Sequence, residues 1–160
     1  MDITQFSRSF DVRRLDGKDV ELIYDMSREN HIFYKYHPPF VTRESILEDM
    51  AALPPGKDYK DKIYCGFFEK NTLISMMDLI LDYPEKGIGF IGLFMMNASY
   101  QGKGIGSMII NELLSYMRKL GYSKIRIGVD KGNPQSFAFW RKNGFVTYKE
   151  DNYFHMELAL

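Results

Sequence analysis

The sequence has little of what marks secreted, membrane-bound or strongly charged proteins. It contains one cysteine, Cys65, which cannot form a disulfide within the chain, so an extracellular domain held together by disulfides is disfavoured. The N-terminal segment lacks the basic start and apolar core of a signal peptide, and the longest apolar runs, such as 88–96, are far too short to span a bilayer. We therefore expect a soluble cytoplasmic protein.

An excess of either charge is also missing. The chain has 21 Lys and Arg residues and 21 Asp and Glu residues. A protein that holds nucleic acid through its overall charge is usually basic, so nucleic acid is not an expected partner, and neither is a membrane. Apolar residues make up 45% of the 160 residues and aromatic residues 15%, which suits one domain over 1–160 with a large core or an apolar groove.

Hydrophobic periodicity predicts an α+β protein with α/β/α layers around a mixed sheet. Apolar residues at helical spacing predict helices over about 17–29, 42–53, 104–120 and 134–142. Alternating or continuous apolar runs predict strands over 9–15, 63–68, 73–83, 88–96, 124–129, 145–148 and 153–158. Segment 31–40 is rich in aromatic residues and has paired prolines, so it is predicted to be irregular.

A glycine-rich turn between a predicted strand and a predicted helix is the most informative segment. Gly102, Gly104 and Gly106 fall where the helix begins. Glycines let the backbone approach a ligand closely and expose several N–H groups together, while the positive end of the helix points at the same place. The turn therefore predicts a phosphate or pyrophosphate site. The alternative is a turn that only connects the two elements.

Spacing excludes two better-known phosphate-binding loops. A Walker loop needs Ser or Thr after its Gly-Lys pair, but Gly104 follows Lys103. A dinucleotide-binding fingerprint needs a glycine three residues after Gly106, where this sequence has Ile109.

Two motifs resemble those of the GNAT superfamily of N-acetyltransferases. The Q/R-x-x-G-x-G/A motif stands as QGKGIG over 101–106, and an asparagine followed by a helix and a Gly-Phe pair stands over 133–145. The order of the predicted elements also matches, so the resemblance covers nearly the whole chain. It implies a mixed, mostly antiparallel sheet of about seven strands, in which a central parallel pair, here 88–96 and 124–130, splays apart.

The resemblance also implies acetyl-CoA as acyl donor, held between the splayed strands, and no metal. The pantetheine arm would pair with the backbone of Leu93, Phe94 and Met95, and Asn133 and Trp140 would lie beside the pantetheine and the thiol. The pyrophosphate would rest on N–H groups of Gln101, Gly102, Lys103, Gly104, Ile105, Gly106 and Ser107. Three nearby cations either reach the nucleotide phosphate or are solvated: Lys131, Arg141 and Lys142.

The implied reaction is direct attack on the acetyl thioester by a primary amine of a small molecule or peptide. An alkylammonium has a pKa of roughly 10, so supplying the neutral amine at pH 7 costs around 4 kcal/mol unless a base helps. The leaving thiol, with a pKa of roughly 8.5, needs little help. The Met95 N–H is the family-based donor to the developing oxyanion.

The sequence departs from the family pattern at both proton-transfer positions. Many members place a Tyr acid seven residues after the Asn, and some place a Glu base five residues before it; here these residues are Trp140 and Gly128. Indole is only a hydrogen-bond donor. Two alternatives therefore stay open, a non-catalytic acyl-CoA-binding or regulatory domain and a nucleotide-binding module that uses the same loop.

Asp78 is the candidate replacement base. It stands in an apolar run, where a carboxylate is costly to bury unless it is paired or hydrogen-bonded. A hairpin that turns at 84–87 places it roughly opposite Gly92, and burial would raise its pKa toward a useful range. The alternative is a structural carboxylate held by a backbone or tyrosine donor.

The acceptor is expected to be selected by segment 31–60, whose aromatic residues predict a partly apolar pocket. His31 and His37 in this segment are either bases, substrate contacts or ordinary surface residues. Cys65 is expected to be a buried apolar side chain. We expect a small-molecule or peptide amine as partner, and we allow for a homodimer.

Overall fold

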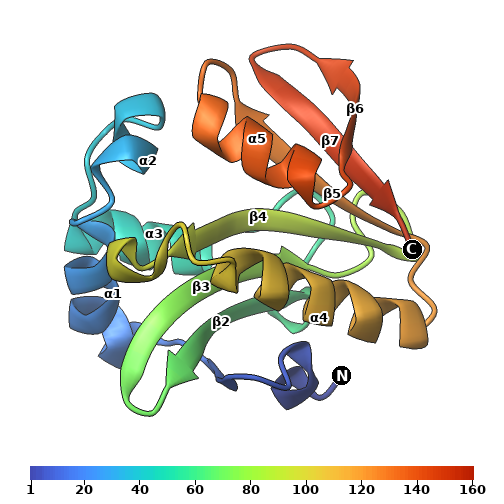
Figure 1. Ribbon diagram of the computed structural model, residues 1–160. Helices are drawn as coiled ribbons and strands as arrows, with labels where there is room; N and C mark the ends of the chain where they lie inside the picture. Colours follow the sequence, from blue (N-terminus) through green and yellow to red (C-terminus); the bar gives the residue numbers. More distant parts are fainter.

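The computed structural model describes all residues, 1–160, and has a seven-stranded sheet between two layers of helices (Figure 1). The strands are β1 Asp11–Arg14, β2 Lys62–Glu69, β3 Thr72–Ile80, β4 Ile88–Met96, β5 Lys124–Asp130, β6 Val146–Glu150 and β7 Tyr153–Ala159. The helices are α1 Val20–Ser27, α2 His31–Tyr36, α3 Arg43–Ala51, α4 Ile105–Lys119 and α5 Pro134–Lys142. No helix is both long and apolar enough to cross a bilayer.

The sheet is mixed, with the strand order β1-β2-β3-β4-β5-β7-β6. All neighbouring strands are antiparallel except β4 and β5, which pair in parallel. That pairing runs from Ile88 opposite Lys124 to Ile91 opposite Ile127 and then stops, so the two strands diverge toward their C-terminal ends. The expected α+β fold with a splayed parallel pair is confirmed.

Two apolar cores hold the layers together, one on each face of the sheet. Helices α4 and α5 cover one face, where Leu113 and Trp140 join residues of the strands. Helices α1 and α3 cover the other, where Ile23 and Ile46 pack over Met76. Strands β2 and β3 are therefore covered on both sides, which explains their nearly continuous apolar sequence.

The helix boundaries follow local capping signals. Thr42 caps α3 by accepting a hydrogen bond from the Ser45 N–H, and Asn133 caps α5 by accepting one from the Ser136 N–H. The first predicted helix begins as a single 3₁₀ turn, Gly17–Asp19, before α1.

The prediction of an irregular segment over 31–40 is wrong for its first part, which forms the short helix α2. Its aromatic side chains pack on one another, with the Phe33 and Tyr34 ring centroids 4.9 Å apart and those of Tyr34 and Phe40 5.2 Å apart. These contacts compensate for the low helix propensity of aromatic residues. Pro38 and Pro39 follow the helix end, as the breaker signal requires.

Candidate active site

Strand β4 changes its pairing at Gly92. Leu79 of β3 pairs with Ile91, but the preceding residue, Asp78, pairs with Leu93, so Gly92 is an extra residue in β4 and forms a β-bulge. The pairing of β4 with β5 ends at Ile91, immediately before this bulge. The backbone of β4 beyond Gly92 therefore has a free edge toward β5, which an extended ligand can pair with.

The direction of the backbone along this edge is fixed by its hydrogen bonds. The Asn97 N–H donates to the Ile74 carbonyl at 2.8 Å, and the Met95 carbonyl accepts from Ser75 Oγ at 2.9 Å, so both residues face β3. Because the backbone groups of successive residues point to opposite sides of a strand, the Phe94 N–H points toward the gap between the diverging strands β4 and β5. The Met95 N–H, which the family pattern suggested as the donor to an oxyanion, therefore faces β3.

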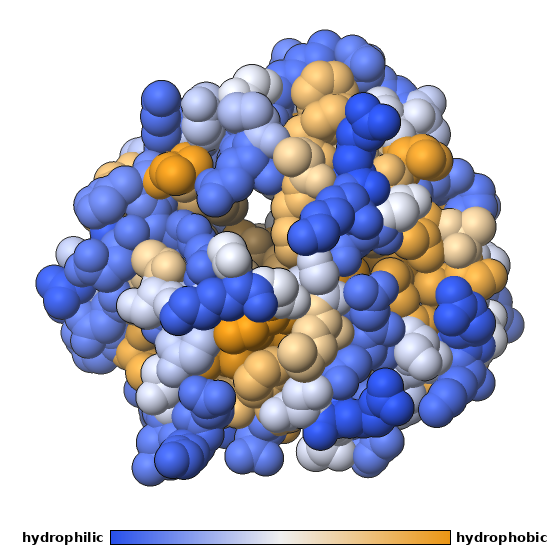
Figure 2. All heavy atoms as spheres, viewed as in Figure 1, coloured by the Kyte–Doolittle hydropathy of each residue, from blue (hydrophilic) through white to orange (hydrophobic).

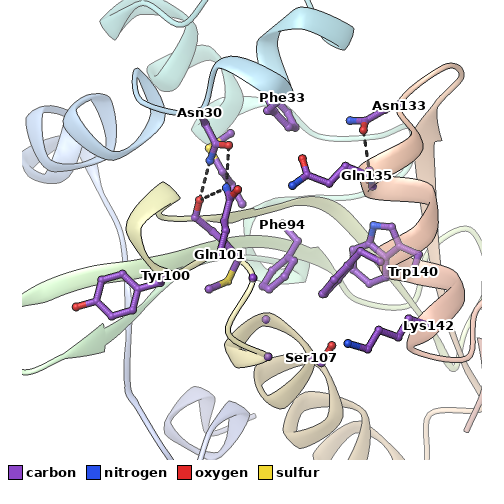
Figure 3. A pocket seen from close by; sticks show the side chains of 17 residues that line it. Asn30, Phe33, Phe94, Tyr100, Gln101, Ser107, Asn133, Gln135, Trp140 and Lys142 are labelled. Carbon is purple, nitrogen blue, oxygen red and sulfur yellow. Dashed lines mark hydrogen bonds between the residues drawn. The ribbon is translucent and has the colours of Figure 1, made fainter.

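A cavity of about 260 Å³ lies between β4, the glycine-rich turn and α5 (Figure 3). In the space-filling view the molecule is hollowed at this place, between α2 and α5, with apolar side chains inside (Figure 2). Nine residues expected at the cofactor site line the cavity: Phe94, Met95, Gln101, Gly102, Gly104, Gly106, Ser107, Asn133 and Trp140. Of the eight further lining residues, Lys142 was considered for the nucleotide phosphate, and the other seven, among them Asn30, Phe33 and Phe139, were not expected as contacts.

Four expected site residues do not line this cavity. Leu93 packs on the α1 and α3 side of the sheet, and Ile105 packs on the α4 side. The Lys103 ammonium lies 5.8 Å from the centre of the Tyr100 ring. Asp78, in β3, lies on the other face of the sheet and is described below.

The glycine-rich turn leaves the start of α4 open. Gly102 and Gly104 have φ angles of +72° and +79°, and no heavy atom lies within 4 Å of where a Cβ would stand on either. Gly104 precedes α4, and no side chain caps this helix. The first N–H groups of the 15-residue helix are thus available, at its positive end, to an anion in the cavity.

Asn30 joins the first helices to the glycine-rich turn. Its Nδ2 donates to the Met96 carbonyl at 2.6 Å, and Gln101 Nε2 donates both to that carbonyl at 3.2 Å and to Asn30 Oδ1 at 3.0 Å. Figure 3 shows this triangle at one wall of the cavity. The Gln101 side chain of the first motif is therefore a brace for the loop. No local signal in the sequence singles out Asn30, because its partners lie 66 and 71 residues away.

Replacing Asn30 tests whether its hydrogen bonds hold the glycine-rich turn in place. We expect Asn30→Ala to lower the free energy of unfolding by about 1–3 kcal/mol, because buried polar groups lose their partner, and to weaken CoA binding by loosening the turn. Thermal denaturation and calorimetric titration with CoA measure both effects. Asn111→Ala, on the exposed face of α4, is the control and should change neither. Equal CoA affinity in both variants would contradict a role for Asn30 in holding the loop.

Asp78 forms a buried ion pair. Its Oδ2 lies 2.7 Å from Lys62 Nζ, and the two side chains are 15% and 4% exposed. Lys62 also donates to the Asp49 and Ala52 carbonyls at the end of α3, both at 2.9 Å. Asp78 Oδ1 is buried and has no hydrogen-bond partner. Burial raises the pKa of Asp78 above the usual carboxyl value, and Lys62 opposes this shift.

The position of Asp78 agrees with its expected place near Gly92. A Cβ built on Gly92 would stand 3.2 Å from Asp78 Oδ2, so a larger residue there would crowd the carboxylate on the bulge side. Gly92 itself is exposed. The carboxylate therefore lies next to the point where β4 leaves β5, on the face of the sheet opposite α4 and α5.

The ion pair also makes a prediction about stability. Lys62→Met should destabilise the fold by about 3–5 kcal/mol, because it leaves a buried carboxylate without its cation and the end of α3 without a donor. Lys60→Met is the matched control: that ammonium pairs with Asp58 but is 79% exposed, so no measurable loss is expected. Chemical denaturation of the two variants compares them, and equal midpoints would show that the buried pair contributes nothing.

The two histidines of the acceptor segment have different surroundings. His37 Nδ1 lies 3.1 Å from Asp130 Oδ2, which connects the end of α2 to the end of β5 across the mouth of the gap. His31 is exposed and stacks near Phe40, with ring centroids 6.1 Å apart. His37 is therefore the histidine placed near the gap.

The cations considered for the phosphate, the cysteine and the possible metal ligands remain to be placed. Among the three cations considered for the nucleotide phosphate, Lys142 lines the cavity, whereas Lys131 pairs with Glu150 at 3.4 Å. Cys65 is fully buried, as expected, and burial raises the pKa of its thiol to about 12, so it is not a nucleophile near neutral pH. No group of three or more metal-ligating side chains is arranged around a common point.

The family model described as "Acetyltransferase (GNAT) family" matches residues 21–145, which include the bulge, the glycine-rich turn and α5. The chain belongs to the GNAT acetyltransferase family. It is accordingly an acyltransferase that uses acetyl-CoA as acyl donor, as the two motifs implied.

Individual acetyltransferases resemble the chain over most of its length. The spermidine N(1)-acetyltransferase of Thermoplasma acidophilum is 24% identical over 154 residues, which cover 89% of this chain and 92% of that protein. An acetyltransferase from Thermus thermophilus has a TM-score of 0.80 at 19% identity, covering 94% of this chain and 97% of the other. The spermidine N-acetyltransferase of Vibrio cholerae, solved with CoA and spermine, has a TM-score of 0.68 at 18% identity, covering 94% and 95%.

Proposed function

We propose that this GNAT enzyme transfers the acetyl group of acetyl-CoA to a primary amine of a small molecule, by direct attack of the amine on the thioester. The observation that carries the proposal is the cavity between β4, the uncapped start of α4 and α5, which offers backbone donors at one end and an aromatic wall at the other. That combination suits a ligand with a diphosphate at one end and an apolar arm.

Different residues on the cofactor side would bind different parts of the ligand. The N–H groups of the turn and first helical residues, 101–107, would hold the pyrophosphate, with Lys142 beside it. The free edge of β4 would pair with the pantetheine arm, and the Phe94 N–H would donate to the thioester carbonyl as negative charge develops there. Asn133, whose side-chain oxygen already caps α5, has its Nδ2 left for the arm.

The acceptor would enter from the other face of the sheet. There Asp78 would take the proton from the ammonium through Oδ2, which lies beside the exposed Gly92, whereas Oδ1 is fully buried. The raised pKa of Asp78 brings it closer to that of the amine, which helps proton transfer. His37 and Asp130 would form the rim of the entrance.

We propose a cationic acceptor, a small di- or polyamine. The candidate entrance carries carboxylates, Asp78 and Asp130, which attract a second ammonium group. The two relatives described above as spermidine N-acetyltransferases support this choice over a peptide amine. The proposal retains a single domain over 1–160 and a cytoplasmic location, where such metabolites and acetyl-CoA would be available.

An acetyl-transfer assay tests the proposal. The purified protein is incubated with acetyl-CoA and a panel of amines, and the released thiol is measured: we expect turnover with spermidine and related amines, and less with amino acids or peptide N-termini. Binding of CoA without turnover on any amine would favour a non-catalytic acyl-CoA-binding domain. Displacement of a labelled nucleotide by ATP and not by CoA would favour a nucleotide-binding module.

A further inference from the structure

The side chain of Trp140 is buried, and its indole N–H has no partner within the protein. The residue is 3% exposed and lines the cavity. No protein group accepts a hydrogen bond from its Nε1. Asp78 Oδ1 is the only fully buried side-chain N or O atom that lacks a partner, so the indole nitrogen has accessible surface, and its residue lines the cavity. Figure 3 shows no interaction at this nitrogen. A buried tryptophan N–H usually finds an acceptor, so a ligand atom is the expected one.

Three aromatic rings fix the orientation of this donor. Trp140 makes edge-to-face contacts with Phe94, Phe139 and Phe145, at centroid distances of 5.9, 5.1 and 4.9 Å and interplanar angles of 66°, 82° and 73°. The three rings hold the indole in one orientation, so its N–H cannot turn to another acceptor.

The position of Trp140 corresponds to the thiol end of the proposed ligand, and the inference rests on that proposed function. The glycine-rich turn, at one end of the cavity, would hold the diphosphate. Phe94 offers its backbone N–H to the gap, and its ring contacts Trp140. A thioester whose carbonyl oxygen meets the Phe94 N–H therefore has its sulfur on the side of the indole.

We infer that Trp140 stabilises the departing thiolate by donating a hydrogen bond, without transferring its proton. As the amine attacks, the C–N bond forms, the C–S bond breaks, and the electron pair of that bond goes to sulfur. Asp78 has taken one proton from the ammonium before the attack, the nitrogen loses its second proton to water as the amide forms, and the thiolate later takes a proton from water. The indole keeps its own proton throughout, since it is a donor only. The thiolate is therefore the form in which sulfur leaves the acetyl group.

The thiol pKa of bound CoA tests this role directly. We expect it to be lower in the native enzyme than in Trp140→Phe, which keeps an aromatic ring but has no N–H, and to differ by about one to two units, as for a hydrogen bond to a charged group. Ultraviolet absorbance of the thiolate during a pH titration of the CoA complex measures it. The same variant should lower kcat about 10- to 100-fold while KM for acetyl-CoA changes little.

Two further proteins separate this role from packing. Phe145→Leu removes a neighbour of Trp140 that does not line the cavity, so it should lower the melting temperature but leave the thiol pKa unchanged. Trp140 is the only tryptophan of the chain. Biosynthetic replacement of tryptophan by β-(3-benzothienyl)alanine, in which sulfur stands for the N–H at nearly the same shape, should therefore raise the thiol pKa even if Trp140→Phe folds poorly.

The outcomes distinguish the inference from the proposed function. Normal acetyl transfer with an unchanged thiol pKa in both proteins that lack the N–H would overturn the role of Trp140 and leave the proposed function intact. An equal rise in thiol pKa in Phe145→Leu would also overturn it, because packing would then be the cause. Absence of CoA binding and of turnover in the native protein would overturn the proposed function itself.

Discussion

CoA will not bind measurably to the Gly104→Val variant. At φ +79° a β-branched residue is strained by about 1–2 kcal/mol, and its side chain would occupy the open space at the start of α4 that the diphosphate needs. Loss of several backbone hydrogen bonds to an anion corresponds to a decrease in affinity of roughly 100-fold or more. Calorimetric titration with CoA measures the affinity, and a thermal melt without ligand measures the strain.

Gly121→Val provides the matched control. Gly121 follows the other end of α4, has a φ of +85°, and has no heavy atom within 4 Å of its Cβ position. The two substitutions thus impose similar backbone strain, at opposite ends of one helix. We expect similar losses in melting temperature but normal CoA binding in Gly121→Val. If both variants bound CoA equally well, the diphosphate would not lie on the glycine-rich turn.

Asp78→Asn will lower turnover by roughly 100-fold or more, the usual range for loss of a general base, with CoA affinity nearly unchanged. The amide keeps the shape of the carboxylate and its oxygen can still accept from Lys62. The pH profile gives a second readout. Only the ionised carboxylate takes a proton, so kcat/KM of the native enzyme should rise as pH increases through the raised pKa of Asp78, and this limb should be absent in the variant.

Asp82→Asn makes the same chemical change four residues further along, in the turn after β3, where the carboxylate accepts the Gly87 N–H at 2.7 Å. Turnover should be unchanged there. Unchanged turnover in Asp78→Asn together with a lower melting temperature would show that Asp78 serves only the ion pair with Lys62, and that the neutral amine is supplied in another way.

The sequence predicts the cofactor side of this molecule well because its signals are local. The bounds of β4 and α5 agree with the expected 88–96 and 134–142, and the glycine-rich turn lies where the motif indicates. Each of these features depends on residues close together along the chain, such as an apolar run, an Asn-Pro helix start or three neighbouring glycines.

The acceptor side is harder to predict because its contacts join distant segments. Lys62 and Asp78 become partners only through the pairing of β2 and β3, and the bulge at Gly92 shifts the register beside them. The family pattern suggested Met95 as oxyanion donor, but the bulge and the bonds to β3 turn Phe94 toward the gap instead. Helix α2 forms because its aromatic residues meet, which residue-by-residue propensity does not describe.

Asn30 and Gln101 both donate a hydrogen bond to the Met96 carbonyl, and this has a consequence for the redesign of the enzyme. A transplanted 31–60 segment would give this enzyme a new substrate preference without disturbing the phosphate-binding loop, because it leaves in place the Asn30 side chain that connects the first helices to that loop. A chimera joined before Asn30 would lose affinity for the acyl donor as well as its original acceptor specificity. A junction placed after Asn30 would change the acceptor specificity alone.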